Sequence, residues 1–172
     1  MGSELKIERA NLSDVKEIWE IFQFAIASRK SEGSQQWQDG YPNENSIRED
    51  VQNLNGWIIK GENKILVYAA VIFEPEPAYA NIQGKWLSNG EYVTLHRIAV
   101  STEAKGKGIV QILFKEIEKL AILNKIHSIR VDTNYDNFAM LHILKKLEYT
   151  YCGEVLMRNS PRKAFEKILS QL

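Results

Sequence analysis

Two glycines alternate with two lysines in the segment Lys105 to Val110 (KGKGIV). The run Tyr92 to Val100 (YVTLHRIAV) precedes this segment and is apolar almost throughout, which is typical of a buried strand. From Val110 to Ala121 the apolar residues recur at helical spacing. The first N–H groups of a helix are unpaired and lie at the positive end of its dipole. The pattern therefore predicts an anion site, most simply a phosphate site, where this helix begins.

The segment does not have the spacing of two common phosphate loops. No G-x-x-x-x-G-K-[ST] motif occurs, and the two glycines do not fit G-x-G-x-x-G. A pair of glycines alone is more often an ordinary loop. The strand before the pair and the helix after it are what favour the phosphate interpretation.

The whole chain limits the class of protein. Its 172 residues are enough for one domain with a sizeable core, and we predict a single domain over residues 1–172. The 22 basic and 22 acidic residues balance, which argues against nucleic acid as a main partner. The sequence has one cysteine, Cys152, no metal-ligand spacing, no apolar run long enough for a membrane helix and no signal-peptide core. We therefore expect a cytoplasmic protein without a metal or a membrane partner.

Further elements must position the anion site, and periodicity locates most of them. Strands are predicted at residues 5–9, 57–60, 64–73, 128–133 and 149–157, and helices at 15–29, 46–54 and 138–147. Asn45 or Ser46 is expected to cap the second helix. The last segment, residues 163–172, fits either a helix or a hairpin strand. This order predicts an α/β fold around one mixed sheet.

The central segment and the residues after it resemble the GNAT superfamily of N-acetyltransferases. The family's loop motif Q/R-x-x-G-x-G/A follows a strand that ends in hydrophobic-x-Val, and here LHRIAV precedes KGKGIV. A second family motif, an Asn near the start of a helix, is matched within Asp132 to Tyr149. The chain looks most like bacterial members that carry QWQDGYP in the first inter-helix loop and an HRIAV strand. The resemblance implies a GNAT fold with about six to seven strands and about four helices, splayed around a CoA slot.

The resemblance also implies that acetyl-CoA is the co-substrate. Amides of the loop would contact the pyrophosphate, the preceding strand would pair with the pantetheine arm, and Asn137 would touch that arm. For Asn137, the cap of a helix is an equally good interpretation from the sequence. The predicted cofactor-binding residues are Ile98, Ala99, Val100, Lys105, Gly106, Lys107, Gly108, Ile109, Val110 and Asn137.

His96 is the candidate general base for transfer of an acetyl group to an amine. By strand alternation it shares a face with Thr94 and Ile98, and family members carry Glu or His at this position. An imidazole suits proton uptake near neutral pH. A buried structural histidine is the alternative interpretation. Arg97 is expected on the opposite face in an ion pair, with Asp132 as a candidate partner.

Three positions depart from the family pattern. Lys105 replaces the usual Gln or Arg, and Val110 replaces a small residue, but the backbone cradle is retained. Leu144 occupies the position where many members carry a tyrosine proposed to protonate the departing thiolate. Tyr135, in the turn before the helix, could supply that hydroxyl, and we include it with His96 as a catalytic candidate.

Two segments could bind the acceptor amine. In the loop QWQDGYP, Trp37 and Tyr41 could wall a pocket and Asp39 could attract an ammonium group. The alternative is a loop that Trp37 fixes to the core. Glu76, in the Pro-flanked exit of a strand, could bind an ammonium group or be only solvated.

The function that follows is an acetyl-CoA-dependent N-acetyltransferase, in which a small-molecule or peptide amine attacks the thioester directly in a ternary complex. The alternative is a catalytically weak CoA-binding sensor or regulatory module on the same fold, favoured by Leu144. A homodimer is possible for either function.

Overall fold

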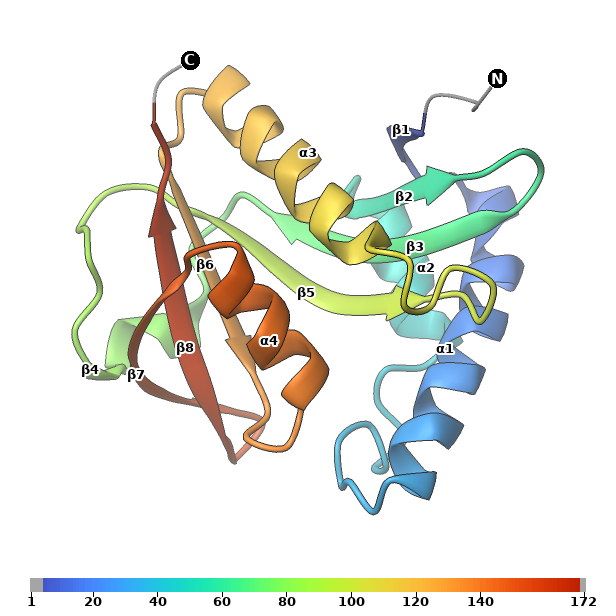
Figure 1. Cartoon of the computed structure of the whole chain (residues 1–172), viewed down its shortest axis with the longest axis horizontal. Coiled ribbons are helices and arrows are strands. Elements are labelled where there is room, and N and C mark those ends of the chain that lie inside the picture. Colours follow the sequence, from blue (N-terminus) through green and yellow to red (C-terminus); the bar gives the residue numbers. More distant parts are fainter. Residues whose placement is uncertain (1–4, 171–172) are drawn as a thin grey trace. The chain divides into compact units, whose positions relative to one another are not determined.

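The computed structural model describes residues 5–170 (Figure 1). Its contacts divide the chain into two compact units that alternate along the sequence. Unit 1 comprises Met1–Val71 and Arg97–Leu113, and unit 2 comprises Ile72–His96 and Phe114–Leu172. Strand β5 (Val93–Val100) and helix α3 (Ile109–Leu123) are each divided between the two units, β5 after His96 and α3 after Leu113. Residues on both sides of the His96–Arg97 bond therefore belong to one continuous strand.

Unit 1 contains the strands β1 (Lys6–Arg9), β2 (Gly56–Lys60) and β3 (Ile65–Ile72), of which the last residue falls in unit 2. Strand β2 pairs with both β1 and β3, and both pairs are antiparallel. Two helices, α1 (Val15–Ser31) and α2 (Glu44–Gln52), complete the unit, and the short helix η1 (Leu12–Asp14) precedes α1. The predicted strands and the first helix are confirmed within a few residues.

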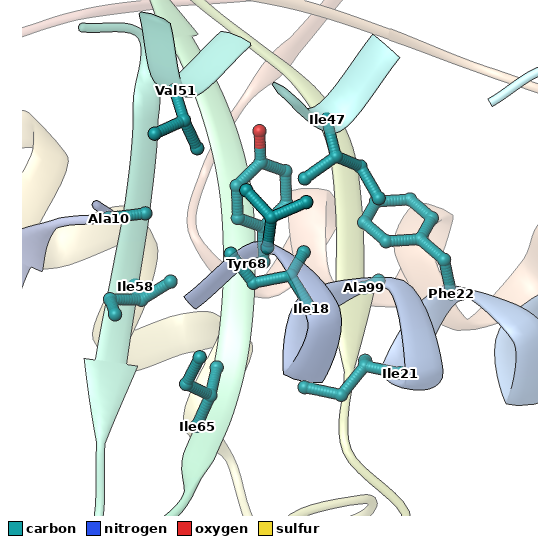
Figure 2. Close-up of a cluster of buried hydrophobic side chains, with 11 residues drawn as sticks. Ala10, Ile18, Ile21, Phe22, Ile47, Val51, Ile58, Ile65, Tyr68 and Ala99 are labelled. Carbon is teal, nitrogen blue, oxygen red and sulfur yellow. The ribbon is translucent and has the colours of Figure 1, made fainter. Parts of the chain in front are cut away.

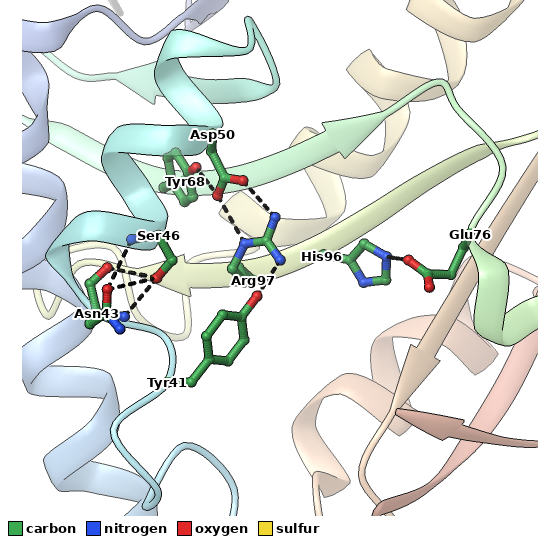
Figure 3. A network of polar contacts seen from close by, with 8 residues as sticks. All are labelled: Tyr41, Asn43, Ser46, Asp50, Tyr68, Glu76, His96 and Arg97. Carbon is green, nitrogen blue, oxygen red and sulfur yellow. Dashed lines mark hydrogen bonds and ion pairs between the residues drawn. The ribbon is translucent and has the colours of Figure 1, made fainter. Parts of the chain in front are cut away.

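The second helix begins two residues earlier than predicted. Its N-cap is Asn43, not Asn45 or Ser46. The Asn43 side chain accepts a hydrogen bond from the Ser46 N–H at 2.9 Å, and the Ser46 hydroxyl accepts one from the Asn43 N–H at 2.7 Å (Figure 3). This reciprocal capping box satisfies backbone donors that would otherwise be unpaired, and it fixes where α2 starts.

The core of unit 1 lies between its helices and its strands. Figure 2 shows Ile18 and Phe22 of α1 beside Tyr68 of β3, with Ile47 of α2 next to Phe22. The aromatic rings of Phe22 and Tyr68 meet edge to face, with centroids 5.6 Å apart. Burial of these side chains is the main force that holds α1 and α2 against the strands. The buried cluster is Ala10, Val15, Ile18, Ile21, Phe22, Ile47, Val51, Ile58, Ile65, Tyr68 and Ala99.

Unit 2 is built on β6 (Ser128–Thr133), β8 (Ser160–Ile168), β7 (Thr150–Met157) and the two-residue β4 (Gln83–Gly84). The first part of β5 pairs in parallel with β6, and the other pairs are antiparallel. In Figure 1 the helix α4 (Phe138–Lys146) is drawn in front of β6. The short helix η2 (Pro77–Asn81) and β4 lie where the sequence predicted neither a helix nor a strand.

Residues 5–170 contain four α-helices and an eight-stranded mixed sheet in the order β1-β2-β3-β5-β6-β8-β7-β4. The α/β fold with a mixed sheet is confirmed, with more strands than the predicted six to seven. One addition is β4, where Gly84 and Gly153 approach so closely that a Cβ on Gly84 would lie 2.1 Å from the Cys152 carbonyl oxygen. The other is β8, which resolves the ambiguous last segment as a strand as far as Ile168; residues 171–172 lie outside the described residues. No helix in the described part of the chain is long and apolar enough to cross a membrane.

Candidate active site

The glycine–lysine loop of unit 1 has the backbone that an anion cradle requires. Gly106 and Gly108 adopt φ values of 77° and 74°, a left-handed conformation that favours glycine. The loop uses two of its own amides, because Lys105 donates to the Ser101 carbonyl and Lys107 donates to the Ala104 carbonyl. No backbone carbonyl among residues 5–170 accepts from Gly106 or Gly108.

Helix α3 begins immediately after this loop, at Ile109. The amides of its first turn have no acceptor within the helix and point toward the loop end. The side chains of Lys105 and Lys107 are exposed, and a Cβ on Gly106 would meet nothing within 4 Å. The residues present therefore fit a phosphate group, with backbone donors at Gly106, Gly108, Ile109 and Val110, since the amides of Lys105 and Lys107 donate within the loop.

Strand β5 has an irregular backbone at Arg97. This residue has a φ of 50°, a left-handed conformation that is uncommon for a residue other than glycine. His96, Arg97 and Ile98 are all half-buried in succession, whereas the Ala99 side chain is buried in the core of unit 1. The left-handed residue interrupts the regular strand here, and the face that His96 is predicted to share with Thr94 and Ile98 stays a prediction. The backbone of Ile98, Ala99 and Val100 remains the part that a ligand could contact.

Arg97 makes a buried polar network in unit 1 (Figure 3). Its Nε donates to Asp50 Oδ2 at 2.9 Å, its Nη2 donates to Asp50 Oδ1 at 2.6 Å, and its Nη1 donates to the Tyr41 hydroxyl at 2.6 Å. Tyr68 donates to the same Asp50 carboxylate at 2.8 Å. Burial opposes the charge of Arg97, but the hydrogen bonds and charge of Asp50 outweigh it and hold the guanidinium pKa above its ordinary value. The expected pair between Arg97 and Asp132 is wrong, since Asp50 is the partner.

The QWQDGYP loop is anchored within unit 1. The Trp37 ring packs on Phe22 with centroids 5.4 Å apart, as the structural interpretation of this residue predicted. Asp39 is exposed and accepts a long hydrogen bond of 3.4 Å from the Tyr41 N–H. Through its hydroxyl, Tyr41 joins the loop to Arg97. Acceptor binding by Trp37, Asp39 and Tyr41 stays a prediction.

Unit 2 places His96 between two carboxylates. Its Nε2 lies 3.4 Å from Glu76 Oε2, a contact drawn as a dashed line in Figure 3, and its Nδ1 lies 3.7 Å from Asp132 Oδ1. The His96 side chain is only 11% exposed, and its Nε2 has no hydrogen-bond partner among the described residues. Burial of an unpaired acceptor is costly unless a ligand or water supplies the missing donor. The imidazole is thus positioned to receive a proton.

The segment after β3 fixes Glu76. Its side chain caps η2 by accepting from the Ala78 N–H at 3.3 Å, and its own N–H donates to the Tyr92 hydroxyl at 2.9 Å. Two of the residues selected from the sequence, His96 and Glu76, are therefore brought together within one unit.

Asn137 and Tyr135 lie at the start of α4. Asn137 is the N-cap, and its side chain accepts from the Met140 N–H at 3.2 Å, which confirms the capping alternative. Tyr135 is 44% exposed and its hydroxyl donates to Glu154, which raises the tyrosine pKa to about 12. Leu144 is fully buried. Tyr135 would have to release Glu154 to protonate a thiolate, so its catalytic role stays a prediction.

The sequence did not identify Asp132 and Tyr79 as the surroundings of His96. The register of β5 and β6 explains the position of Asp132. Val93 pairs with Ile129 and Thr94 with Arg130, and the same offset aligns His96 with Asp132. This register cannot be predicted from the sequence alone. No comparable signal marks Tyr79. Residues 5–170 contain no group of three His, Cys, Asp or Glu side chains arranged to hold a metal ion.

The fold and the loop–helix geometry define a class, and comparison with known proteins identifies it. Residues 15–149 match the model of the acetyltransferase (GNAT) family. A GNAT-family acetyltransferase structure from Streptococcus agalactiae is 36% identical, covers 99% of both chains and superposes with a TM-score of 0.90. The chain therefore belongs to the GNAT family of acetyltransferases.

More distant structures share the fold. A ribosomal-protein-alanine N-acetyltransferase from Brucella melitensis is 19% identical, with 96% of this chain and 100% of the other covered and a TM-score of 0.68. A Salmonella typhimurium protein, solved with its cofactor acetyl-CoA, is 15% identical, with 99% and 96% covered and a TM-score of 0.67. No protein among curated sequences matches the chain.

Proposed function

We propose that this acetyltransferase uses acetyl-CoA and transfers the acetyl group to a primary amine of a small molecule or a peptide, by direct attack in a ternary complex. The observation that carries the proposal is the buried His96 Nε2, which lacks a hydrogen-bond partner among the described residues and lies 3.4 Å from Glu76. An amine that reacts in its neutral form needs a nearby acceptor for its proton, and this imidazole can provide one.

The loop before α3 would hold the co-substrate. We assign the pyrophosphate to the free amides of Gly106, Gly108, Ile109 and Val110, with Lys105 and Lys107 supplying positive charge. The backbone of Ile98, Ala99 and Val100 would pair with the pantetheine arm as an added strand does. Asn137 would contact the same arm through whichever amide atoms its capping bond leaves free. Bound acetyl-CoA supplies the activated acetyl thioester, and a structural neighbour with acetyl-CoA supports this assignment.

The residues around His96 would handle the acceptor. Glu76 attracts the ammonium form of the amine. Trp37, Asp39 and Tyr41 of unit 1 are separate candidates for contacts with the acceptor. His96 Nε2 takes one proton from the ammonium group and leaves the neutral amine. The amine nitrogen then bonds to the acetyl carbon, the carbon–sulfur bond breaks, and the nitrogen releases its second proton to water. Backbone N–H groups near Val100 stabilise the negative charge on the carbonyl oxygen. The leaving thiolate takes a proton from Tyr135 or from water.

The cofactor loop belongs to unit 1 and His96 belongs to unit 2. Because β5 and α3 run through both units, we propose that residues 1–172 act as a single acetyltransferase domain in the cytoplasm. A homodimer is compatible with this function, and light scattering of the purified protein would measure the mass.

The test is an acetyl-transfer assay with acetyl-CoA and a panel of polyamines, aminoglycosides, amino acids, arylalkylamines and peptides, with release of free thiol as the readout. We expect at least one class of amine to be acetylated in a saturable manner. If acetyl-CoA fails to raise the melting temperature and no amine reacts, the proposed function is wrong.

A second candidate function, a CoA-binding sensor or regulatory module, rests on Leu144. Its side chain is fully buried at the position that carries a tyrosine in many GNAT members. The sensor predicts that acetyl-CoA raises the melting temperature while no amine in the panel is acetylated. The acetyltransferase predicts both binding and turnover.

A further inference from the structure

We propose that Asp132, held by the hydroxyl of Tyr79, is a positioning residue for His96 and fixes the imidazole with its proton on Nδ1 and its Nε2 free to act as the base. The inference rests on the proposed function, since the free Nε2 matters only if His96 receives a proton from the acceptor amine. All three residues lie in unit 2.

The first step is the bond between Tyr79 and Asp132. The Tyr79 hydroxyl donates to Asp132 Oδ1 at 2.6 Å, and the Asp132 side chain is only 5% exposed. A short bond to a charged acceptor in a buried environment is among the stronger hydrogen bonds in proteins. It directs Oδ1, the oxygen that also faces His96, into a fixed position.

The second step is the rigidity of Tyr79. Its ring is buried and lies 5.1 Å from the Trp86 ring and 6.0 Å from the Tyr92 ring, while the Trp86 indole donates to the Tyr79 carbonyl at 2.9 Å. Burial, and then the charge of Asp132, raise the pKa of Tyr79 well above its ordinary value. Tyr79 therefore keeps its proton over the working range of an enzyme and remains a donor to Asp132.

The third step concerns the two ring nitrogens of His96. The partner of one nitrogen determines which of them carries the proton in the neutral ring. Nδ1 lies 3.7 Å from Asp132 Oδ1, whereas Nε2 lies 3.4 Å from Glu76 Oε2 without forming a hydrogen bond and has no other partner among residues 5–170. The distance to Asp132 is longer than a hydrogen bond, and such contacts shorten when a substrate complex forms. Once an ammonium group pairs with Glu76, Asp132 is the carboxylate that still favours a proton on the ring, so Nδ1–H is retained and the lone pair is left on Nε2.

The arrangement separates the tasks of the two carboxylates. Asp132 lies 3.7 Å from Nδ1, the nitrogen that would keep its proton. Glu76 lies 3.4 Å from Nε2, the nitrogen that would gain one. An ammonium group that enters between Nε2 and Glu76 would be attracted by the carboxylate and could pass its proton to the ring. Loss of Asp132 would therefore impair the base without removing the group that attracts the amine.

The closing experiment combines nitrogen NMR with kinetics. The chain has three histidines, so a ¹⁵N-histidine-labelled sample gives few signals, and the variant His96→Gln identifies those of His96. At alkaline pH we expect the wild-type His96 to carry its proton on Nδ1. In Asp132→Asn we expect a shift toward Nε2–H and a fall in kcat of at least about 10-fold, with KM for acetyl-CoA unchanged. Tyr79→Phe should lower kcat by a smaller factor.

A matched pair in the same unit provides the control. Tyr149 donates to Glu118 at 3.1 Å, so it forms a similar tyrosine–carboxylate bond, and Lys167 rather than a histidine lies beside that carboxylate. Tyr149→Phe and Glu118→Gln should alter the melting temperature but not kcat or the His96 signals.

The outcomes are distinguishable. If Asp132→Asn retains the wild-type kcat, or if kcat falls while the His96 tautomer is unchanged, the positioning role is wrong. If the wild-type protein acetylates no amine, the proposed function fails, and the nitrogen spectra still decide whether Asp132 sets the tautomer.

Discussion

Arg97 and Asp50 form a two-pronged ion pair in which both guanidinium–carboxylate distances are below 3 Å, at 2.9 and 2.6 Å. The arginine is also the residue that interrupts strand β5 with a φ of 50°. A left-handed arginine in a strand is strained, and such conformations persist only where surrounding interactions determine them. The hydrogen bonds to Asp50 and Tyr41 hold Arg97 in this conformation. The next residue is Ile98, where the predicted cofactor contacts begin.

Arg97→Lys is therefore expected to destabilise the protein. A lysine cannot make the two-pronged bond, and Asp50, whose side chain is 9% exposed, would be left with a poorly paired charge. Breaking a buried pair of this kind costs about 3 kcal/mol of unfolding free energy. Denaturation in urea measures the loss. The exposed pair of Lys64 and Glu103 is the control, because Lys64→Ala should leave the stability nearly unchanged. Equal effects of the two substitutions would contradict the role given to Arg97.

The glycines of the loop can be tested by acetyl-CoA binding. Gly106→Ala and Gly108→Ala each place a side chain on a left-handed backbone, at a cost of about 1–2 kcal/mol. We expect each to weaken acetyl-CoA binding by about 10-fold or more in calorimetry, since 1.4 kcal/mol corresponds to a factor of ten. Gly90→Ala is the matched control, because its added Cβ also meets nothing within 4 Å and its backbone is not left-handed. Unchanged affinity in both loop variants would rule out the cradle.

Glu166 gives a prediction about pH. Its buried carboxylate accepts from Ser128 and Ser88 and pairs with Arg130 at 3.2 Å. Burial alone would raise its pKa, but the bonds from Ser128 and Ser88 and the charge of Arg130 outweigh burial and hold the pKa below the ordinary 4.5.

The sign of the effect follows from that direction. The unfolded chain binds the proton at a higher pH than the folded one, so the stabilisation is complete above about pH 4.5 and declines as the pH falls through the folded pKa. Glu166→Gln should lose about 3 kcal/mol at pH 7, and its difference from wild type should shrink below pH 4.5. A difference that stays constant down to pH 3 would contradict this explanation.

Tyr135 can be separated from water as the source of the thiolate's proton. The hydrogen bond to Glu154 raises its pKa to about 12, so Tyr135→Phe should remove a tyrosinate transition near pH 12 from the ultraviolet titration. If Tyr135 is the acid, Tyr135→Phe lowers kcat by about 10-fold or more, and Glu154→Gln, which frees the hydroxyl, does not lower it. An unchanged kcat in Tyr135→Phe would assign the proton to water.

Local patterns in the sequence predicted most of the fold. Strand β3 is an apolar run, β6 alternates apolar with polar residues up to Asp132, and α3 has a clear helical stripe, so the residue types predict these elements. The loop glycines were equally informative because a left-handed backbone favours that residue. Patterns failed where tertiary contacts decide: β8 has Ala164, Phe165 and Glu166 buried in succession, and a buried glutamate gives no strand signal.

Part of the candidate site was also predictable from residue types. His96 and Glu76 were selected by chemistry, and the structure brings them together. The partners of His96 and Arg97 were not predictable, because they depend on strand register and on a strand irregularity at Arg97. Asp132 of β6 was expected beside Arg97. It instead lies beside His96, the residue that precedes Arg97 in β5.

The most direct test of the account is the steady-state kinetics of His96→Gln with acetyl-CoA and the best acceptor amine. Glutamine retains a polar side chain but cannot accept the proton, so kcat should fall by about 100- to 10,000-fold. Calorimetry on the same variant should give the wild-type affinity for acetyl-CoA. A His96→Gln variant that turns over at the wild-type rate would show that His96 is a structural histidine and would contradict the mechanism.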